Sequence, residues 1–342
     1  MPNYSENPLI TFGITTFKRP KFLQETVQSV LSQDYKNFRV IIGNDNPLET
    51  ISFKSLGIKE DSRIQILNYK KNIGEVKSMN FMLSKASTEW FSWLADDDIL
   101  HPQFISKFIE VNNSIKEKNI SAILCDYIEG KDTINFIKDS VISNLSNTYD
   151  FDSYVANFFG RKIKVIGVYG FIKTEVAKEI GGIKHFGDQV PLFSDTSFGI
   201  ELAAKGKIII SQSQLFFLRS HEESTSTVIS NWDDIIPSEK DFLKFLKALF
   251  KRKLSSKKNY DKFMFLTIRW FCANNLGETL RQKNQLKIFS LFQFIYLQKK
   301  WLYEIKPTYF FLFFLFVLLQ VYLIIFNYFK KNMGSIKTSI LR

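Results

Sequence analysis

Three adjacent carboxylates, Asp96, Asp97 and Asp98, directly follow the apolar run Phe91–Leu94 and the small residue Ala95. Carboxylates this close together repel one another strongly when they lose contact with water. A divalent cation could supply the opposing charge, and Asp oxygens are hard ligands that suit Mg²⁺ or Mn²⁺ together with water and phosphate oxygens. The alternative is a solvated turn in which Asp98 caps the next helix. The position after a predicted strand favours a metal and phosphate site.

Two further polar clusters follow other apolar runs. After the first run, the ring of Phe17 could stack on a flat base, and Lys18 or Arg19 could approach phosphates. Asp45 comes shortly after the run Phe38–Ile42, and its carboxylate could accept a hydrogen bond from a base N–H or a ribose hydroxyl. Each cluster alone is weak, but the three together indicate one shared ligand site.

The elements that must position these residues alternate between strands and helices. The predicted strands cover Leu9–Thr15, Phe38–Ile42, Ile64–Leu67, Phe91–Leu94 and Ala122–Leu124, and the predicted helices cover Pro20–Gln33, Gly74–Ser87 and Pro102–Asn113. This alternation predicts an α/β fold with a mostly parallel central sheet that is covered on both faces. Ligands bind such sheets beyond the carboxyl ends of the strands. Further along, Val165–Ile172 predicts a strand, Phe198–Lys205 a short helix and Lys207–Leu218 one strand or two.

The 342-residue chain carries a formal charge of +12, and this charge is unevenly distributed. Residues 1–236 have a net charge of −3, and residues 237–342 have a net charge of +15. An enzyme that acts on nucleic acid normally carries its basic surface around the active site, so we predict no nucleic-acid partner. Cys125 and Cys272 indicate reduced core thiols, and the polar stretch Met1–Asn7 lacks the apolar run of a secretory signal. We therefore expect the folded part in the cytosol.

The charge distribution predicts three domains. We assign residues 1–236 to a catalytic domain, 237–305 to a basic amphipathic helical region and 306–342 to a hydrophobic membrane-anchoring helix with a short basic tail. Basic helices with Phe and Leu opposite their lysines suit an anionic membrane surface, and a solvated helix packed on its own domain is the alternative. The run Tyr309–Phe326, of about 18 residues, could span a bilayer or lie in one leaflet, and a buried core helix is the alternative. We expect attachment to the cytoplasmic face of the inner (plasma) membrane.

Together the motifs resemble glycosyltransferase family 2, the inverting enzymes with the GT-A fold, over roughly residues 8–225. The segments that carry the resemblance are ITTFKRP, GNDNP, the Asn72–Asn80 segment, which is similar to N-x-G-x-x-x-A-x-N, and LADDDILHP, which looks like the family's DXD region. Three positions depart from the family pattern. Asn44 replaces the usual first Asp, Phe17 the commoner Tyr, and Ala95 occupies the first DXD position.

The resemblance implies a nucleotide-sugar site. It places donor contacts at Thr15, Phe17, Arg19, Asp45, Asn72 and Asp96, and a Mn²⁺ or Mg²⁺ cofactor at Asp97 with Asp96 and His221. The metal would act as a Lewis acid on the departing diphosphate. His221 lies in an Arg-x-His segment similar to one in the family, and a structural role is its alternative.

The same resemblance suggests a catalytic base. In an inverting displacement a carboxylate removes the proton of the acceptor hydroxyl as that oxygen attacks the anomeric carbon. Asp195, in the segment Phe193–Thr196, is our candidate, and Asp188 is the reserve. The alternative is that Asp195 only caps the following helix.

These inferences predict a metal-dependent inverting hexosyltransferase. Its donor would be a UDP-sugar or, failing that, a dTDP- or GDP-sugar, and its acceptor a lipid-linked or cell-surface glycan. A sugar-nucleotide nucleotidyltransferase is one alternative, but residues 15–20 lack the glycine cluster that it needs. A catalytically degenerate membrane-bound scaffold is the other alternative. Asn44 keeps it open, whereas the intact Asp96, Asp97 and Asp195 argue against it.

Overall fold

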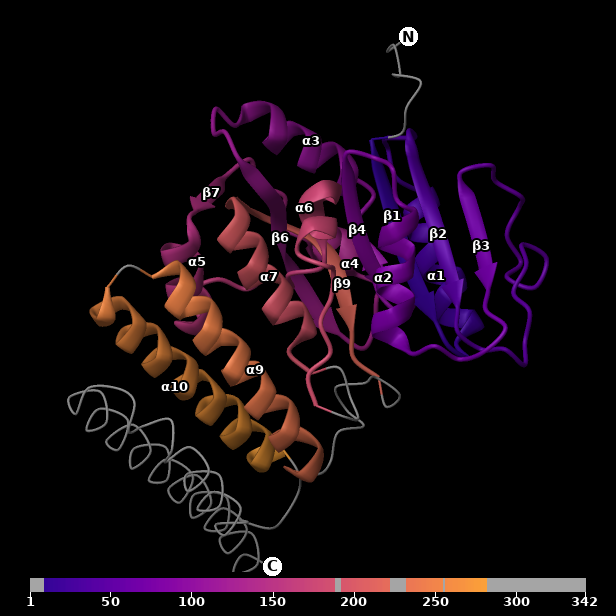
Figure 1. Ribbon diagram of the computed structural model, residues 1–342. Coiled ribbons are helices and arrows are strands. Elements are labelled where there is room, and N and C mark those ends of the chain that lie inside the picture. The colour runs from indigo at the N-terminus through magenta and orange to yellow at the C-terminus, as the bar shows by residue number, and fades with distance from the viewer. Residues whose placement is uncertain (1–8, 188–191, 222–231, 255, 282–342) are drawn as a thin grey trace, which may run out of the picture. The chain divides into compact units, whose positions relative to one another are not determined.

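The computed structural model describes residues 9–187, 192–221, 232–254 and 256–281 (Figure 1). The predicted helix over 306–342 and the basic segment 284–302 lie outside these residues. The chain divides into two compact units, one made of Met1–Tyr154 with Ile163–Leu246 and the other of Val155–Lys162 with Lys247–Arg342. The domain limits at 236 and 305 stay predictions. Among the helices of the described ranges, none is both long enough and apolar enough to cross a bilayer.

The first unit alternates strands and helices along its first half, as predicted. Its strands are β1 Ile10–Thr16, β2 Phe38–Asn44, β3 Ile64–Asn68, β4 Trp90–Ala95, β5 Ile99–Leu100, β6 Ile120–Gly130, β7 Ser146–Tyr149, β8 Gly170–Lys173 and β9 Lys207–Arg219. The helices are α1 Pro20–Leu31, α2 Glu75–Lys85, α3 Phe104–Ser114, α4 Phe136–Asp139, α5 Phe151–Phe159, α6 Thr174–Glu179, α7 Ser194–Lys205, α9 Trp232–Lys253 and α10 Lys257–Arg281. The second unit contains the end of α5 from Val155, the end of α9 from Lys247 and the whole of α10.

The strands form one sheet in the order β3-β2-β1-β4-β8-β6-β9-β5, with β7 paired to β9. β1 pairs in parallel with β2 and β4, and β2 pairs in parallel with β3. β8 is antiparallel to both β4 and β6, and β6 and β9 are parallel to each other. The predicted mostly parallel α/β sheet is therefore confirmed, with an antiparallel strand at its centre.

The predicted strand over Val165–Ile172 is wrong in extent, because pairing begins only at Gly170. At Gly167 the close approach of α7 leaves no space for a side chain. A side chain there would place its Cβ 2.4 Å from the carbonyl oxygen of Asp195, so this segment packs its backbone against α7. Helix α7 begins at Ser194 and not at the predicted Phe198, and Lys207–Arg219 is one strand.

Helices cover both faces of the sheet. Successive residues of a strand face opposite sides. In β1, Phe12 contacts the ring of Phe104 in α3 at 5.9 Å, whereas a Cβ on Gly13 would meet Met82 of α2 at 3.3 Å. Helices α2 and α3 therefore lie on opposite faces of the sheet.

Aromatic rings fill much of the core, which accounts for many of the 35 phenylalanines. Phe108 of α3 stacks on Phe171 of β8 with centroids 4.9 Å apart and planes 10° apart. Trp93 meets Phe91 and Phe198 edge-on at 4.8 and 5.0 Å. Burial removes apolar area from water at about 25 cal/mol per Å², so rings of this size dominate the stability of the sheet.

The predicted helical pattern at Asp241–Lys253 is confirmed as the latter part of α9. Phe242, Leu246 and Leu249 are buried on one side, whereas Lys244 is exposed. Cys125 is buried in β6, as predicted, and burial raises the pKa of its thiol. Cys272 lies in α10.

Candidate functional site

The acidic turn, residues 96–98, connects the inner strand β4 to β5, which is the last strand in the order of the sheet. The chain leaves β4 at Ala95 and re-enters the sheet as β5, where Ile99 pairs with Phe217 and Leu100 with Phe216 of β9. The turn between them therefore sits close to the end of β9, where Arg219 and His221 follow. A pocket of about 590 Å³ opens beyond the carboxyl ends of β1, β2 and β4, where a parallel sheet places its ligands.

Most of the predicted site residues line this pocket. They are Thr15, Phe17, Arg19, Asp45, Asn72, Asp96, Asp97 and Asp195, joined by Asp98, Glu75, Glu129, Tyr169 and Arg219. Seven of the lining residues are acidic (Asp45, Glu75, Asp96, Asp97, Asp98, Glu129 and Asp195), and the two basic ones are Arg19 and Arg219. The structure thus brings the separate clusters together, as their positions after successive strands predicted.

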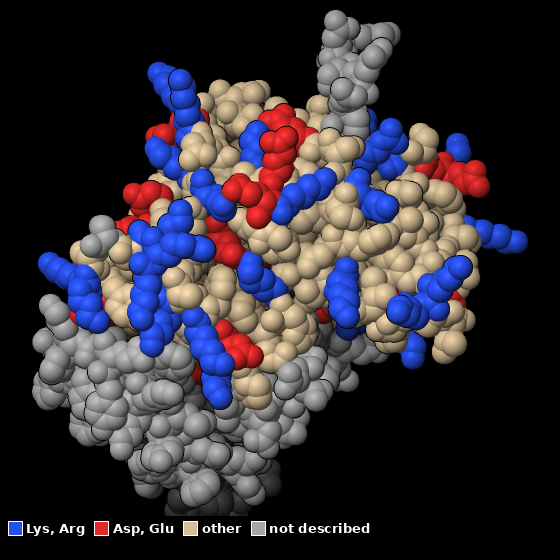
Figure 2. Space-filling view, in the orientation of Figure 1, with Lys and Arg blue, Asp and Glu red and all other residues tan. Residues whose placement is uncertain are grey.

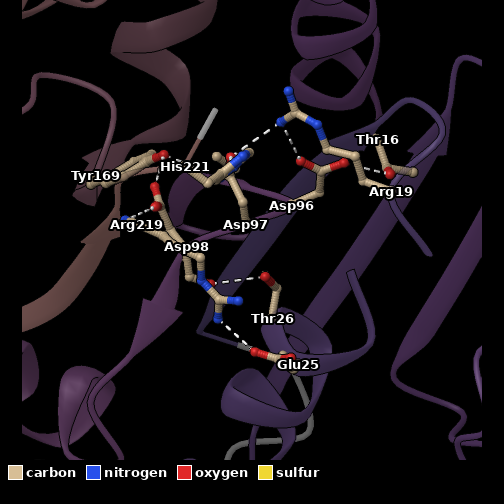
Figure 3. Close-up of polar contacts among 11 residues, drawn as sticks. Thr16, Arg19, Glu25, Thr26, Asp96, Asp97, Asp98, Tyr169, Arg219 and His221 are labelled. Atoms are coloured by element: carbon tan, nitrogen blue, oxygen red, sulfur yellow. Dashed lines mark hydrogen bonds and ion pairs between the residues drawn. The ribbon is translucent and has the colours of Figure 1, made fainter. Parts of the chain in front are cut away.

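Asp98 is the buried anchor of the acidic turn (Figure 3). Its Oδ2 accepts a hydrogen bond from the Tyr169 hydroxyl at 2.6 Å, and its Oδ1 accepts one from the backbone N–H of Arg219 at 2.9 Å. Desolvation raises the pKa of Asp98 to about 8, and Asp97 adds to the rise. Asp98 does not cap α3, because the residue before that helix is Gln103. Its bonds instead tie β4 to β9.

Asp96 and Asp97 point toward Arg19 (Figure 3). The Arg19 Nη1 lies 3.4 Å from Asp96 Oδ1 and 3.1 Å from Asp97 Oδ2. Asp96 also accepts a hydrogen bond from the Thr16 hydroxyl at 2.6 Å. Desolvation raises the pKa of Asp96 to about 6, against the effect of the Thr16 bond. A guanidinium group therefore stands beside two crowded carboxylates, where a cation is favoured.

His221 follows the end of β9 and contacts the carboxylate of Asp97. Its Nε2 lies 2.8 Å from Asp97 Oδ2, and its ring packs on Phe22 with centroids 4.7 Å apart. The guanidinium of Arg219 lies over the same Phe22 ring at 4.8 Å and binds Glu25 of α1 at 2.6 Å. Helix α1 thus supports the predicted Arg-x-His segment.

The donor set fits a divalent metal ion. A carboxylate oxygen of Asp97 and an imidazole nitrogen of His221 lie 2.8 Å apart, and both are atoms that can ligate a divalent metal ion. Asp96 is turned toward Thr16, and among the residues that the structure describes no three such side chains converge as ready-made ligands. The fit rests on the Asp97–His221 pair and on the acidic surroundings.

Asp45 has a backbone role that its sequence position did not reveal. Its two carboxylate oxygens accept hydrogen bonds from the N–H groups of Ile73 and Gly74, at 2.7 and 2.9 Å. The amide of Asn72 donates to the Asp45 carbonyl at 3.2 Å. These bonds fix the loop before α2, so the predicted pair Asp45 and Asn72 shapes one wall of the pocket.

Asn44 is held in a network that requires an amide. Its Nδ2 donates to the carbonyl of Glu49 at 2.6 Å and to Asn68 Oδ1 at 2.8 Å, and its Oδ1 accepts from the backbone N–H of Asn46. Asn68 in turn bonds to both backbone groups of Ile51. A carboxylate at position 44 would face two acceptors, so this departure from the family pattern has a local structural reason.

The polar cluster that follows β1 also lines the pocket, through Thr15, Phe17 and Arg19. The Thr15 hydroxyl donates to Ser78 of α2 at 3.1 Å, and the Phe17 side chain is exposed enough to meet a ligand. Lys18, with φ of 60°, lies over the Phe17 ring at 5.0 Å. Phe17 itself lines the pocket.

Asp195 lies in the first turn of α7 and faces the pocket. Desolvation raises its pKa above the ordinary value of 3.8, although hydrogen bonds from Thr196 oppose the rise. It does not cap α7, because the residue before that helix is Phe193 and makes no side-chain cap. The reserve candidate Asp188 lies outside the described residues.

Sequence reasoning missed several pocket residues, among them Glu75, Glu129 and Tyr169. Glu75 follows Gly74 in the Asn72–Asn80 motif, and desolvation raises its pKa, with Asp97 and Asp195 adding to the rise and Arg19 opposing it. Its place after the motif glycine was the available signal. Tyr169 has no such signal, because it lies in an irregular segment whose strand pairing starts only at Gly170.

The fold is that of the GT-A glycosyltransferases. The structure of Staphylococcus aureus TarS 1–349 in complex with UDP-GlcNAc aligns with a TM-score of 0.61 and 13% identity, covering 88% of this chain and 82% of that one. The structure of TarS 1–349 alone gives a TM-score of 0.58 at 12% identity.

Sequence comparison matches part of the chain to a known family. Residues 11–165 match the model of glycosyl transferase family 2, and they form a family 2 domain. An uncharacterized glycosyltransferase of Rickettsia conorii is 26% identical over 231 residues, which are 66% of this chain and 36% of the relative. The Campylobacter jejuni GalNAc(5)-diNAcBac-PP-undecaprenol beta-1,3-glucosyltransferase is 31% identical over 108 residues, 31% of this chain and 35% of that protein. The chain spans between 16% and 39% of the length of the first three curated relatives.

We predict that Tyr169→Phe destabilises the protein by about 1–3 kcal/mol, because Asp98 and the backbone N–H of Ala95 each lose a buried partner. The Tyr169 bond lowers the pKa of Asp98, so it favours the ionised carboxylate. The loss should therefore be larger above pH 8 or so, where Asp98 ionises, than below it. Urea unfolding across pH measures this.

Tyr149→Phe is the control for this change, because Tyr149 is only half-buried in β7. An equal loss of stability in both variants, without dependence on pH, would contradict the anchoring role of Asp98.

Proposed function

We propose that this chain transfers a sugar from a nucleotide-diphosphate donor to a hydroxyl group, with inversion at the anomeric carbon. The observation that carries the proposal is the acidic pocket at the carboxyl edge of a GT-A sheet, with Asp97, His221 and Asp195 around it. A UDP-sugar is the first candidate donor, because the TarS structure that shares the fold holds UDP-GlcNAc. A dTDP- or GDP-sugar is the second.

A divalent cation resolves the charge problem that this pocket poses. A donor diphosphate is anionic, and a pocket lined by seven acidic and two basic residues would repel it. Asp97 and His221 would hold Mn²⁺ or Mg²⁺, with Asp96 beside them. When bound, the metal would supply Lewis-acid stabilisation of the leaving diphosphate. Arg19 would be freed from the carboxylates and could turn toward a phosphate oxygen.

Asp195 serves as the base in this proposal. The acceptor oxygen forms its bond to the anomeric carbon as the bond from that carbon to the diphosphate oxygen breaks, and the acceptor proton passes to the Asp195 carboxylate. The raised pKa of Asp195 makes it a stronger base than an ordinary aspartate. Glu75 faces the same space and could accept a hydrogen bond from a sugar hydroxyl.

The nucleotide-binding walls would be formed by the remaining predicted residues. Phe17 offers an open ring for stacking, and Thr15 lies beside it. Asp45 and Asn72 hold the opposite loop.

We expect Asp97→Asn to abolish Mn²⁺-dependent donor binding while the protein stays folded, because the amide loses the charge but keeps the size of the side chain. A thermal-shift panel of nucleotide sugars with and without Mn²⁺ measures this. Asp61→Asn is a control, since Asp61 pairs with Arg63 at the opposite end of β3 from the site. Unchanged donor affinity with Mn²⁺ in the Asp97 variant would refute the metal assignment. If the wild-type protein turns over only with a sugar phosphate and a nucleoside triphosphate, it is a nucleotidyltransferase instead. If it shows no turnover at all, the scaffold alternative holds.

Asp195→Asn should leave donor binding largely intact and lower transfer by about two or more orders of magnitude. A base must be ionised, so the wild-type rate should fall on the acid side through a pKa above 3.8, and the variant should lose this limb. Rates of UDP release across pH provide the measurement. Near-normal turnover in the variant would move the role of base to another residue.

The acceptor and the location form the second part of the proposal. The Campylobacter jejuni relative is named for an undecaprenol-linked acceptor, which favours a lipid-linked glycan as the acceptor here. The turn between α9 and α10 offers a matching surface. Its exposed cations are Lys251, Arg252, Lys253, Lys257, Lys258 and Lys262, which we call the basic hairpin. The only acidic residue between positions 242 and 270 is Asp261, which is buried and pairs with Lys257 at 3.2 Å.

Anionic lipid headgroups fit the basic hairpin, since each Lys or Arg near such a surface contributes about 1 kcal/mol. We propose that the chain binds the cytoplasmic face of the inner membrane through this surface and the region that follows it. Figure 2 shows basic side chains scattered over the described part of this face with acidic ones between them, so the test must alter the hairpin alone.

Reversing three hairpin charges, with Lys251→Glu, Arg252→Glu and Lys253→Glu combined, should weaken binding to vesicles that contain anionic lipid by at least about tenfold. Vesicle flotation with and without anionic lipid measures the effect. Reversal of three exposed lysines of the first unit, Lys54, Lys59 and Lys118, is the matched control. Equal binding by both triple variants would contradict a role for the basic hairpin.

A further inference from the structure

The backbone that carries Asp195 begins at a residue in a rare conformation. Phe193, directly before α7, has φ of 62° and ψ of 8°, which is the left-handed region. Bulky residues without a glycine's freedom seldom adopt it. The Phe193 carbonyl accepts the first hydrogen bond of the helix, from the N–H of Ser197 at 2.8 Å. The conformation of Phe193 therefore sets the direction of the turn in which Asp195 lies.

A ring from α9 holds Phe193 in place. The rings of Phe193 and Phe242 are stacked, with centroids 5.1 Å apart and planes 11° apart. Phe242 is completely buried and also meets Phe186 at 5.3 Å. Both Phe193 and Phe242 belong to the first compact unit, which extends along α9 as far as Leu246.

A second contact from α9 holds the start of the same loop. The Ser238 hydroxyl donates to the carbonyl of Phe186 at 2.8 Å. Gly187, with φ of 72°, passes so close that a Cβ there would lie 2.3 Å from the Ser238 Oγ. Helix α9 thus contacts the chain at Phe186 through Ser238 and at Phe193 through Phe242.

The catalytic domain itself supplies the other supports of this turn. The Ser194 hydroxyl donates to the carbonyl of Lys184 at 2.6 Å. The carbonyl of Asp195 rests on Gly167, where a Cβ would approach it to 2.4 Å. These contacts fix the backbone on either side of Asp195, but neither holds the left-handed conformation of Phe193.

Building on the proposed function, we propose that Phe242 is a positioning residue for the base Asp195, acting through its stack on Phe193. The residue lies 47 positions further along the chain than Asp195 and lines no part of the pocket in the described structure. Loss of the stack lets Phe193 leave the left-handed region, and the first turn of α7 then moves with it. A misplacement of about 1 Å at a reacting group can cost about a hundredfold in rate.

Phe242→Leu tests this, with Phe245→Leu as the matched control. Phe245 belongs to the same helix and meets Phe186 and Phe242, but Phe242 forms the stack on Phe193. We expect Phe242→Leu to lower UDP release from UDP-GlcNAc with Mn²⁺ by about ten- to a hundredfold, with the affinity for UDP unchanged. Phe193→Tyr, which keeps the ring, should retain the wild-type rate.

Amide hydrogen exchange provides a readout that does not depend on turnover. The N–H groups of residues 194–197 should exchange faster in Phe242→Leu than in the wild type, whereas Phe245→Leu should leave them unchanged. Equal exchange and equal rates in the two leucine variants would overturn the proposal.

Asp195→Asn, measured in the same assay, separates the two proposals. If this variant releases UDP at the wild-type rate, the assignment of the base fails. If it is slow while Phe242→Leu is not, the base assignment stands and the role of Phe242 fails.

Discussion

The buried carboxyl group of Asp98 joins the end of β4 to the end of β9. Its two oxygens are held by the Tyr169 hydroxyl and the Arg219 N–H, and its own carbonyl accepts a hydrogen bond from Thr26 of α1. A buried carboxyl without partners would be costly. Tyr169 and Arg219 satisfy the carboxyl, and Thr26 holds the backbone of the same residue. The two preceding carboxylates are thereby presented to the pocket, and His221 lies beside Asp97.

The charges of the other lining side chains explain how they interact with one another. Asp96 and Asp97 lie against Arg19, whereas Glu75 and Asp195 approach from α2 and α7. Low dielectric strengthens each of these interactions, so a pocket with this excess of carboxylates favours any cation that enters it. In the part of the chain that the structure describes, the Arg19 guanidinium lies against two of these carboxylates. An anionic ligand would need more positive charge than Arg19 and Arg219 provide.

The pattern of residue types within short segments was sufficient to predict the elements whose structure depends on neighbouring residues in the sequence. The strands that precede each polar cluster were predicted within a residue or two, because their β-branched and aromatic runs are short and well separated. The acidic turn was predicted because three carboxylates after a strand need an explanation. Asp195 was predicted only through the family resemblance.

Features that depend on long-range packing could not be predicted. The antiparallel β8 in the middle of the sheet and the hydroxyl of Tyr169 have no periodic signature, because pairing with β4 and β6 decides them. The carboxylate of Asp45 was expected to face a ligand, and it instead accepts two backbone hydrogen bonds before α2. The amide at Asn44 makes sense only beside Asn68, 24 residues away.

The tie between Asp98 and Arg219 spans 121 positions of the chain. A contact of such long sequence separation requires the intervening loop to close, which costs chain entropy. During synthesis, the acidic turn therefore waits for β9 before it acquires its partner. The segment 11–165 that carries the family signature ends before Tyr169, Asp195, Arg219 and His221 have been made. A fragment cut at that boundary would hold the recognisable motifs without a complete pocket.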